Sequence, residues 1–160
     1  TRDARRVAAA DRDLTIARRA GLSDARLAFS YFALGRLSLA RDPEASLNAF
    51  LAASDIYERI APGGIHTAHV DMQLAAFALS AGNADDALRL TGAAMPAATR
   101  AQNAALLSTV LMIRAEALEA LGRASEARQV RLDSLAWGRY GFGTNAAVGA
   151  RLTEVAALSP

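Results

Sequence analysis

Apolar residues recur three or four positions apart in both terminal segments of this chain, as they do on the buried face of an α-helix. In residues 2–20 this face consists of Val7, Ala10, Leu14 and Ala17. In residues 144–158 it consists of Val148, Leu152, Val155 and Leu158. The pattern therefore predicts one helix at each end of the chain.

Between these two segments, a helix-periodic stretch, a short polar turn and a second helix-periodic stretch occur three times. Each turn is followed by an acidic residue and an alanine, at Glu44-Ala45, Asp86-Ala87 and Glu126-Ala127. The spacing between these pairs is 42 residues and then 40 residues. A repeat of this length, built from helix, turn and helix, is typical of α-solenoids.

Residues that begin and end helices lie at the predicted turns. Asp42 is a good N-cap, and Pro43 suits the first helical position, where no N–H is needed. Asn83 can cap the corresponding helix of the second unit. Gly82 and Gly122 lie where the preceding helices should end, because glycine adopts the left-handed conformation without strain.

Three further positions predict details of the helix ends. Ser23 is expected to cap the first helix of the first unit, with Gly21 ending the helix before it. Pro96 is expected to shorten or kink the second helix of the second unit, because it lacks the N–H that a helix interior uses.

Small residues occur at related positions in the three units, where only a small side chain fits between two closely crossing helices. They are Ala33, Ala75 and Ala115 in the first helices, and Ala45, Ala87 and Ala127 in the second helices. Gly82 and Gly122 precede the turn in the later units, where the first unit has Ala40. On these positions the units resemble tetratricopeptide repeats (TPRs), in the form of about 42 residues found in kinesin light chains and many bacterial regulators.

The resemblance leaves two registers open for the first unit. The bulky residue that the family carries early in the first helix appears as Phe29 and Leu111, but the middle unit has Asp71. Arg114 also replaces the usual leucine. The string Tyr-Phe-Ala-Leu-Gly at residues 31–35 offers a second register, since Tyr-x-x-Leu-Gly is itself similar to the family pattern.

The resemblance implies an all-α fold, a right-handed α-solenoid of antiparallel hairpins with about eight helices. Residues 1–160 then form one domain. Its expected parts are an N-terminal helix (1–22), repeat 1 (23–66), repeat 2 (67–101), repeat 3 (102–143) and a C-terminal capping helix (144–160).

In this family pattern the first helix of each unit lines a concave groove. The implied groove residues are His69, Met72, Ala76 and Ser80 in the second unit, and Thr109, Met112, Glu116 and Glu119 in the third. The candidates in the first unit are Leu27, Ser30 and Leu34. A floor of Met and Leu with an acidic end suits an extended or helical peptide that carries a basic residue. The alternative is that the methionines fill the core.

Composition and charge narrow the function only slightly. The chain has no cysteine, which excludes disulfides and Cys-metal sites. All 18 basic residues are arginine, a bias that fits a GC-rich bacterial genome. The net charge is only +2, but six arginines fall in residues 1–20. This segment could bind nucleic acid or an anionic membrane, although a solvated face of a terminal helix is the favoured interpretation.

The two histidines, His66 and His69, lie near Asp71 and raise the hypothesis of a metal site. No third strong ligand follows at a fixed spacing, and His66 is expected to precede a helix that starts near Thr67. The favoured interpretation is a pair of solvent-exposed imidazoles at a helix entry. We expect no bound metal or cofactor.

No residue pattern indicates catalysis. A G-x-S-x-G elbow is absent from the sequence. Glu116 and Glu119 lie three residues apart on one predicted helix, where they cannot face each other across a cleft as glycosidase carboxylates do. Arg114 and Arg123 are expected to pair with them. The sequence therefore favours a protein that is not an enzyme.

The stretch AWGRYGFGTN, residues 136–145, interleaves glycines with aromatic residues. It lacks a GK[ST] ending and is not expected to follow a strand, so it is not a phosphate loop. Gly138 or Gly141 is expected to end the preceding helix. Trp137, Tyr140 and Phe142 are expected to cover the last repeat or hold the closing helix, and direct contact with a ligand is the alternative.

We therefore expect a non-catalytic scaffold that binds a protein or peptide, with self-association through the end helices as a further option. The alternatives are a small-molecule-sensing domain of a bacterial regulator, with its ligand near His69 and Met72, and a nucleic-acid-associated domain that acts through the first helix. No apolar run approaches the roughly 18 residues of a membrane span. The sequence assigns no compartment. A cytoplasmic location is the working expectation, and export of a longer precursor stays open.

Overall fold

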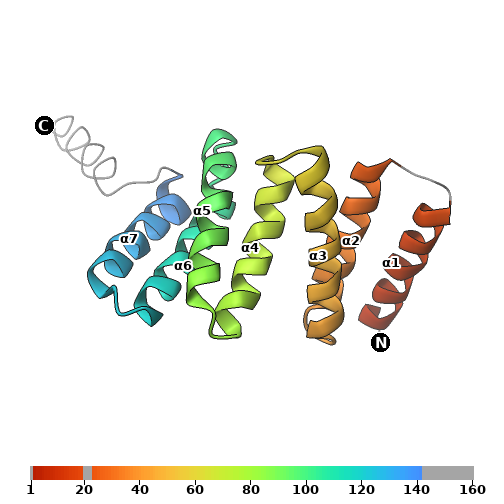
Figure 1. Ribbon diagram of the computed structural model, residues 1–160, viewed down its shortest axis with the longest axis horizontal. Helices are drawn as coiled ribbons and strands as arrows, with labels where there is room; N and C mark the ends of the chain where they lie inside the picture. The colour runs from red at the N-terminus through yellow and green to blue at the C-terminus, as the bar shows by residue number, and fades with distance from the viewer. Residues whose placement is uncertain (1, 20–22, 142–160) are drawn as a thin grey trace, which may run out of the picture.

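The computed structural model describes residues 2–19 and 23–141, and all regular secondary structure in these residues is α-helical. The seven helices are α1 (Arg2–Arg19), α2 (Asp24–Ser38), α3 (Pro43–Ile60), α4 (Ile65–Ser80), α5 (Ala84–Arg100), α6 (Ala104–Ala120) and α7 (Ala124–Tyr140) (Figure 1). The all-α prediction is confirmed, and seven helices in this part of the chain is close to the expected eight. The predicted helix 144–158 and Gly21 lie outside the described residues.

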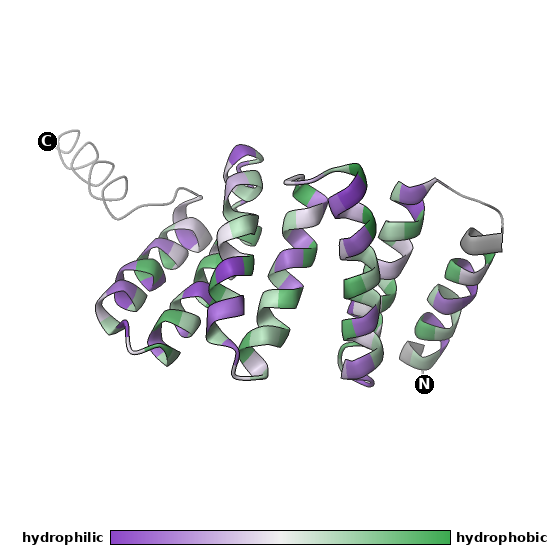
Figure 2. Ribbon diagram, viewed as in Figure 1, coloured by the Kyte–Doolittle hydropathy of each residue, from purple (hydrophilic) through white to green (hydrophobic). Residues whose placement is uncertain are grey.

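The helices follow one another in a row of antiparallel neighbours (Figure 1). The most extensive contacts join α2 to α3, α4 to α5 and α6 to α7, so the chain folds into three successive hairpins. Helix α1 packs against α2, and α4 also contacts α6. Apolar and polar residues alternate around the helices, as expected where one side of a helix packs against its neighbours and the other is exposed to solvent (Figure 2).

The three turns after α4, α5 and α6 have the same backbone geometry. The middle residue of each turn is left-handed: Gly82 has φ 78°, Gln102 has φ 49° and Gly122 has φ 75°. The following N–H then donates to the carbonyl five residues back, at 2.8 to 3.1 Å. The roles predicted for Gly82 and Gly122 are confirmed, whereas Gln102 adopts the same conformation without the freedom of glycine.

Three N-cap side chains satisfy a backbone N–H in the first turn of their helix. Asp42 accepts from Ala45 (2.9 Å), Asn83 from Asp86 (3.2 Å) and Asn103 from Leu106 (3.0 Å). The predicted caps Asp42 and Asn83 are therefore confirmed. Ser23 occupies the predicted N-cap position of α2, where its carbonyl accepts from Arg26 and Leu27, but its side chain makes no capping hydrogen bond.

Pro96 lies inside α5, which continues to Arg100. The prediction of a shortened helix is wrong, because α5 has 17 residues, as α6 and α7 do. Proline removes one backbone donor, so the carbonyl of Gly92 receives no bond from position 96. Both residues are exposed, and solvent can take the place of the missing donor.

Small residues lie at corresponding buried or half-buried positions of the three hairpins. In the first helices they are Ala28 and Gly35, Ala68 and Ala75, and Ser108 and Ala115. In the second helices they are Ser46 and Ala53, Ala87 and Ala94, and Ala127 and Ser134. The positions in the first helices recur every 40 residues, which continues the repeat expected from the sequence.

The first hairpin differs in register from the expectation. Ala33 is only half-buried and Ala45 is exposed, whereas Gly35 and Ser46 occupy the buried positions. Asp42 follows Gly35 by seven residues, and Asn83 follows Ala75 by eight, so the first turn is one residue shorter. In the structure, Gly35 rather than Ala33 is therefore the small buried residue at this position of α2.

Candidate functional site

Three connected hollows run along α4, on the side where it faces α2 and α6. The first has a volume of about 230 Å³ and is lined by Phe29, Phe32, Arg36, Tyr57, Ile65, His66 and His69. The second, of about 210 Å³, is lined by Phe32, Arg36, His69, Met72, Gln73, Ala105, Leu106 and Thr109. The third, of about 240 Å³, is lined by Leu39, Gln73, Ala76, Phe77 and Ser80.

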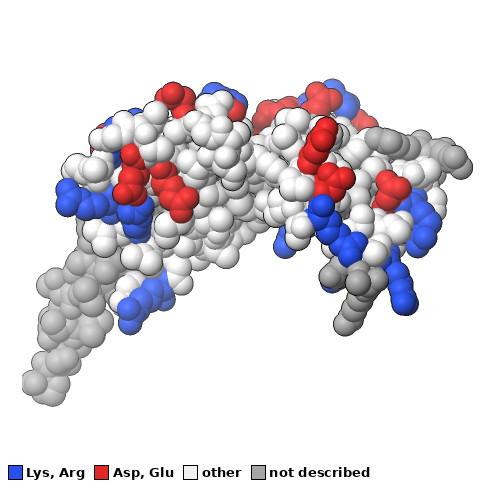
Figure 3. Space-filling model, turned by 90° about the horizontal axis from the view of Figure 1, so that it is seen from below, with Lys and Arg blue, Asp and Glu red and all other residues white. Residues whose placement is uncertain are grey.

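The hollows share lining residues and follow one another along α4, and we call the surface that they form the α4 groove. Phe32, Arg36 and His69 belong to the first and second hollows, and Gln73 joins the second to the third. In a view from below, the molecule is arched, basic side chains lie along its lower edge on both sides of the hollow, and acidic side chains lie on the upper edge and the face turned to the viewer (Figure 3).

The helical period of α4 places its groove residues on one face. His66, His69, Met72, Ala76 and Ser80 follow one another at intervals of three or four residues, which is the spacing of neighbours on one side of a helix. The opposite face of α4 supplies core residues that include Val70 and Leu74. Burial of this second face fixes the rotation of α4 and turns the first face toward the groove.

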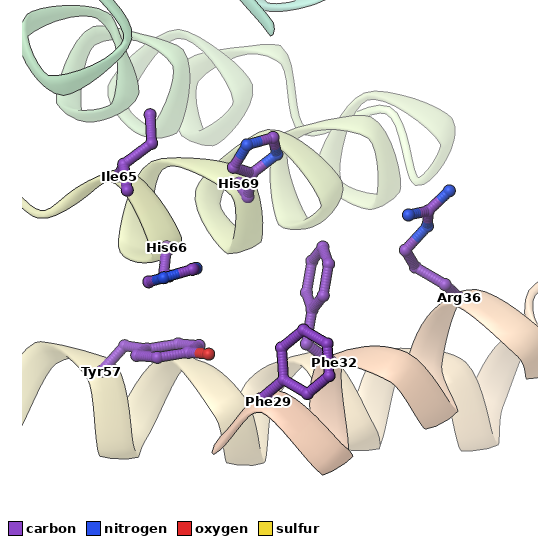
Figure 4. A pocket seen from close by; sticks show the side chains of 7 residues that line it. All are labelled: Phe29, Phe32, Arg36, Tyr57, Ile65, His66 and His69. Carbon is purple, nitrogen blue, oxygen red and sulfur yellow. The ribbon is translucent and has the colours of Figure 1, made fainter. Parts of the chain in front are cut away.

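Aromatic rings from three helices surround the first hollow (Figure 4). His66 stacks on Tyr57 of α3, with ring centroids 5.5 Å apart and planes inclined by 13°. His69 meets Phe32 of α2 edge to face at 6.3 Å. Phe29 of α2 remains 59% exposed, an unusual degree of exposure for so large an apolar side chain. The hollow therefore presents apolar surface that no described residue covers.

The charge of the α4 groove is positive. Among the described residues that line it, Arg36 is the only charged side chain at neutral pH, and no aspartate or glutamate is present. The pKa of His69 is lowered by burial, then by the charge of His66 and that of Arg36. His69 is therefore held neutral at pH 7.

The sequence-predicted groove residues of the second unit all line the groove. His69 and Met72 line the second hollow, and Ala76 and Ser80 line the third. From the third unit only Thr109 does so. Met112 is half-buried outside it, and Glu116 and Glu119 are exposed outside it.

The expected acidic end is therefore not part of the described groove. Glu119 pairs with Arg131 of α7. The expected pairing of Arg114 and Arg123 with the two glutamates is wrong, because Arg123 binds Glu126 at 2.7 Å and Arg114 donates to the carbonyl of Leu88 at 3.0 Å.

In the first unit, the candidates Leu27, Ser30 and Leu34 do not line the described hollows, and three other residues of α2 do. Phe29, Phe32 and Arg36 lie two residues further along the chain than those candidates. This shift equals the change of register that places Gly35, rather than Ala33, at the buried position. The string at residues 31–35 was the signal that could have located them.

The remaining candidates come from the stretch 136–145, which lies partly in α7 and partly outside the described residues. Trp137 is half-buried and packs against the core cluster that contains Leu107. Tyr140 is 47% exposed at the end of α7, with the guanidinium of Arg139 5.5 Å from its ring centroid. Gly141 ends α7 in the left-handed conformation. Phe142 lies outside the described residues.

The histidines are not arranged as a metal centre in the described part of the chain. Helix α4 begins at Ile65, so His66 lies inside it, contrary to the expected start near Thr67. His69 is half-buried rather than exposed, and Asp71 is buried away from both imidazoles in the core. Within residues 2–19 and 23–141, no three His, Cys, Asp or Glu side chains gather as ligands. No described helix is both long and apolar enough to cross a bilayer.

Comparison of the chain with protein-family models, with curated proteins and with solved structures finds no match. The function has to be inferred from the α4 groove and the residues that line it.

Proposed function

We propose that this chain is a TPR-like α-solenoid that binds a segment of another protein in the α4 groove without catalysing a reaction. The three hairpins support the repeat architecture, because small residues recur every 40 residues in their first helices. A groove lined by consecutive first helices is the surface that such repeats offer to a partner. The groove residues come from α2, α4 and α6, with Tyr57 of α3 at one end.

The observation that carries the proposal is the continuity of the three hollows along α4. A helix of 16 residues is about 24 Å long, which matches about seven residues of extended peptide. Each hollow is at most about 240 Å³, below the roughly 300 Å³ at which pockets for small molecules begin. A long, subdivided groove therefore suits successive side chains of a peptide better than one enclosed ligand.

The side chains that line the groove suit the binding of an extended peptide. Met72 has an unbranched, polarisable side chain that adapts to irregular apolar partners. Gln73 lies where the second and third hollows join, and its amide has both donors and acceptors for the backbone of an extended peptide. Apolar contacts would supply affinity, and the few polar groups would fix the orientation of the peptide.

A second candidate function is the sensing of a small molecule in the first hollow. The aromatic lining of this hollow favours it, because ring faces such as that of the exposed Phe29 are surfaces on which a planar ligand can stack. Such a ligand would raise the melting temperature of the protein, and the rise would continue with the logarithm of ligand concentration above its Kd. A metabolite panel that raises the melting temperature, without enrichment of any peptide, would favour sensing over peptide binding.

The test is selection from a library of random heptapeptides displayed on phage. Wild-type protein is compared with Met72→Glu and Ala76→Glu, which place a charge in the second and third hollows. The matched control is Leu51→Glu, because Leu51 is an exposed apolar residue of α3 outside the groove. Circular dichroism first establishes which variants fold.

We expect the wild type and Leu51→Glu to enrich the same peptides, and the two groove variants to lose them. Failure of the wild type to enrich any peptide contradicts the proposal. The proposal is also contradicted if Met72→Glu and Ala76→Glu enrich the same peptides as the wild type, because the peptides would then bind elsewhere.

A further inference from the structure

The first hollow differs from the rest of the α4 groove in having walls of aromatic and imidazole rings. Phe29 and Phe32 approach it from α2, Tyr57 from α3, and His66 and His69 from α4 (Figure 4). A dry apolar cavity of about 150 Å³ holds a benzene molecule. The first hollow, of about 230 Å³, therefore has room for one aromatic side chain and little more.

Arg36 reaches toward α4 beyond Phe32, on the side away from Tyr57 (Figure 4). It lies at the junction of the first and second hollows, since it lines both. Arg59 and Arg89 bind carboxylates and Arg100 binds a backbone carbonyl, whereas the side chain of Arg26 has no partner among the described residues. Arg36 makes no hydrogen bond, ion pair or ring contact within the described part of the chain.

The charge of Arg36 selects the sign of the ligand at this junction. Arg36 comes from α2, and His66 and His69 come from α4, while the α6 residues that line the second hollow are uncharged. Rings alone could hold a cation through their faces. Here a cation would be repelled by the guanidinium, whereas a carboxylate can accept two parallel hydrogen bonds from it.

We propose that the first hollow holds an aromatic side chain of the bound peptide and that Arg36 binds the carboxylate of an acidic residue beside it. This inference rests on the peptide-binding function proposed above and specifies its partner. The sequence pattern favoured a peptide with a basic residue because Glu116 and Glu119 were placed in the groove. Arg36 reverses that preference, because no carboxylate is present among the described residues that line the groove.

The test uses an array of synthetic heptapeptides with phenylalanine at the centre, flanked on both sides by glutamate, glutamine or arginine. A second set carries alanine at the centre. Binding of labelled wild-type protein is compared with that of Arg36→Gln and Arg36→Glu. Arg26→Gln is the matched control, because Arg26 is an exposed arginine of the same helix that does not line the groove.

We expect wild type and Arg26→Gln to bind the glutamate–phenylalanine peptides most tightly, and the alanine-centred set weakly. Arg36→Gln should weaken this binding by roughly tenfold, as expected for loss of a charge-assisted pair. Arg36→Glu should transfer the preference to the arginine-flanked peptides. The reversed preference is a readout that a merely misfolded variant cannot produce.

Results of two kinds overturn the inference, and they can be distinguished. Equal binding of glutamate- and glutamine-flanked peptides, or an equal loss in Arg26→Gln and Arg36→Gln, overturns the role of Arg36 alone. Absence of binding to every peptide on the array, together with a phage selection that enriches nothing, overturns the peptide-binding function as well.

Discussion

Phe50 of α3 packs directly against the backbone of Gly35 in α2. A β-carbon added to Gly35 would lie 2.8 Å from Cε1 of the Phe50 ring, closer than such atoms approach in proteins. The ring is fully buried, with Phe32 at 5.6 Å and Phe77 at 6.2 Å between centroids. Ser46 holds the same crossing by donating its hydroxyl to the carbonyl of Gly35 at 2.7 Å.

We predict that Gly35→Ala lowers the free energy of unfolding by about 1–2 kcal/mol. Overpacking a closed core costs roughly 1–3 kcal/mol, and the better helix propensity of alanine recovers less than about 1 kcal/mol of it. Urea denaturation followed by circular dichroism measures the change. Gly92→Ala is the control, because its new methyl group would meet only the Arg114 guanidinium at 3.6 Å. That variant should be more stable by about 0.5–1 kcal/mol. Similar stability changes in both variants would contradict the close packing at Gly35.

The left-handed conformation of Gln102 makes a second prediction possible. Gly82 and Gly122 occupy the equivalent positions of the neighbouring turns, and nothing would contact a β-carbon at either. Left-handed backbone costs a residue with a side chain about 1–2 kcal/mol, part of which is offset by the greater unfolded-state entropy of glycine. Gln102→Gly should therefore raise the free energy of unfolding by about 0.5–1 kcal/mol.

The reciprocal variant Gly122→Gln should lower it by a similar amount, because it places a side chain in the same strained conformation. Thermal melts of both proteins check the pair. A decrease in stability for Gln102→Gly would show that the glutamine side chain stabilises the turn by more than its backbone costs.

The raised pKa of Asp71 leads us to predict that the stability of the protein depends on pH. Burial, then the charge of Glu58, raises its pKa from 3.8 to about 6, while Arg89 opposes the shift. Because the folded state binds the proton more tightly, stability is highest below the unfolded pKa and is lost as pH rises from about 4 to 6. Asp71→Asn, which carries no titrating group, should be the more stable protein at pH 7 by up to about 3 kcal/mol.

The measurement is the difference in unfolding free energy between wild type and Asp71→Asn from pH 4 to pH 7.5. His69 acts in the opposite sense, since its lowered pKa makes stability fall as pH drops below about 6.5, but this contribution cancels in the difference. Glu58→Gln should move the transition to lower pH. A difference that stays constant across the range would contradict the buried, proton-binding state of Asp71.

Most of the secondary structure could be predicted because its signals are local. Asp42 and Asn83 cap helices through hydrogen bonds to residues three positions away. Gly82 and Gly122 end helices through the conformation of a single residue. Pro96 shows the limit of such rules, because one lost backbone bond is tolerated where the helix is exposed and packed on its other side.

The candidate site could be predicted only in part. The α4 residues His69, Met72, Ala76 and Ser80 were placed correctly on one face, because one helix fixes their relative positions. Tyr57 was missed, since it comes from the last turn of α3 and nothing in its own segment marks it.

The sequence by itself therefore determined most of the helices and their turns, because these depend on interactions within a few residues. The tertiary structure decided which faces meet. Contact between Gly35 and Phe50, together with a turn one residue shorter, sets the rotation of α2 and brings Arg36 to the groove. Helix α6 is rotated so that Glu116 lies outside the groove, so the charge of the site follows from helix rotation, which no local pattern encodes.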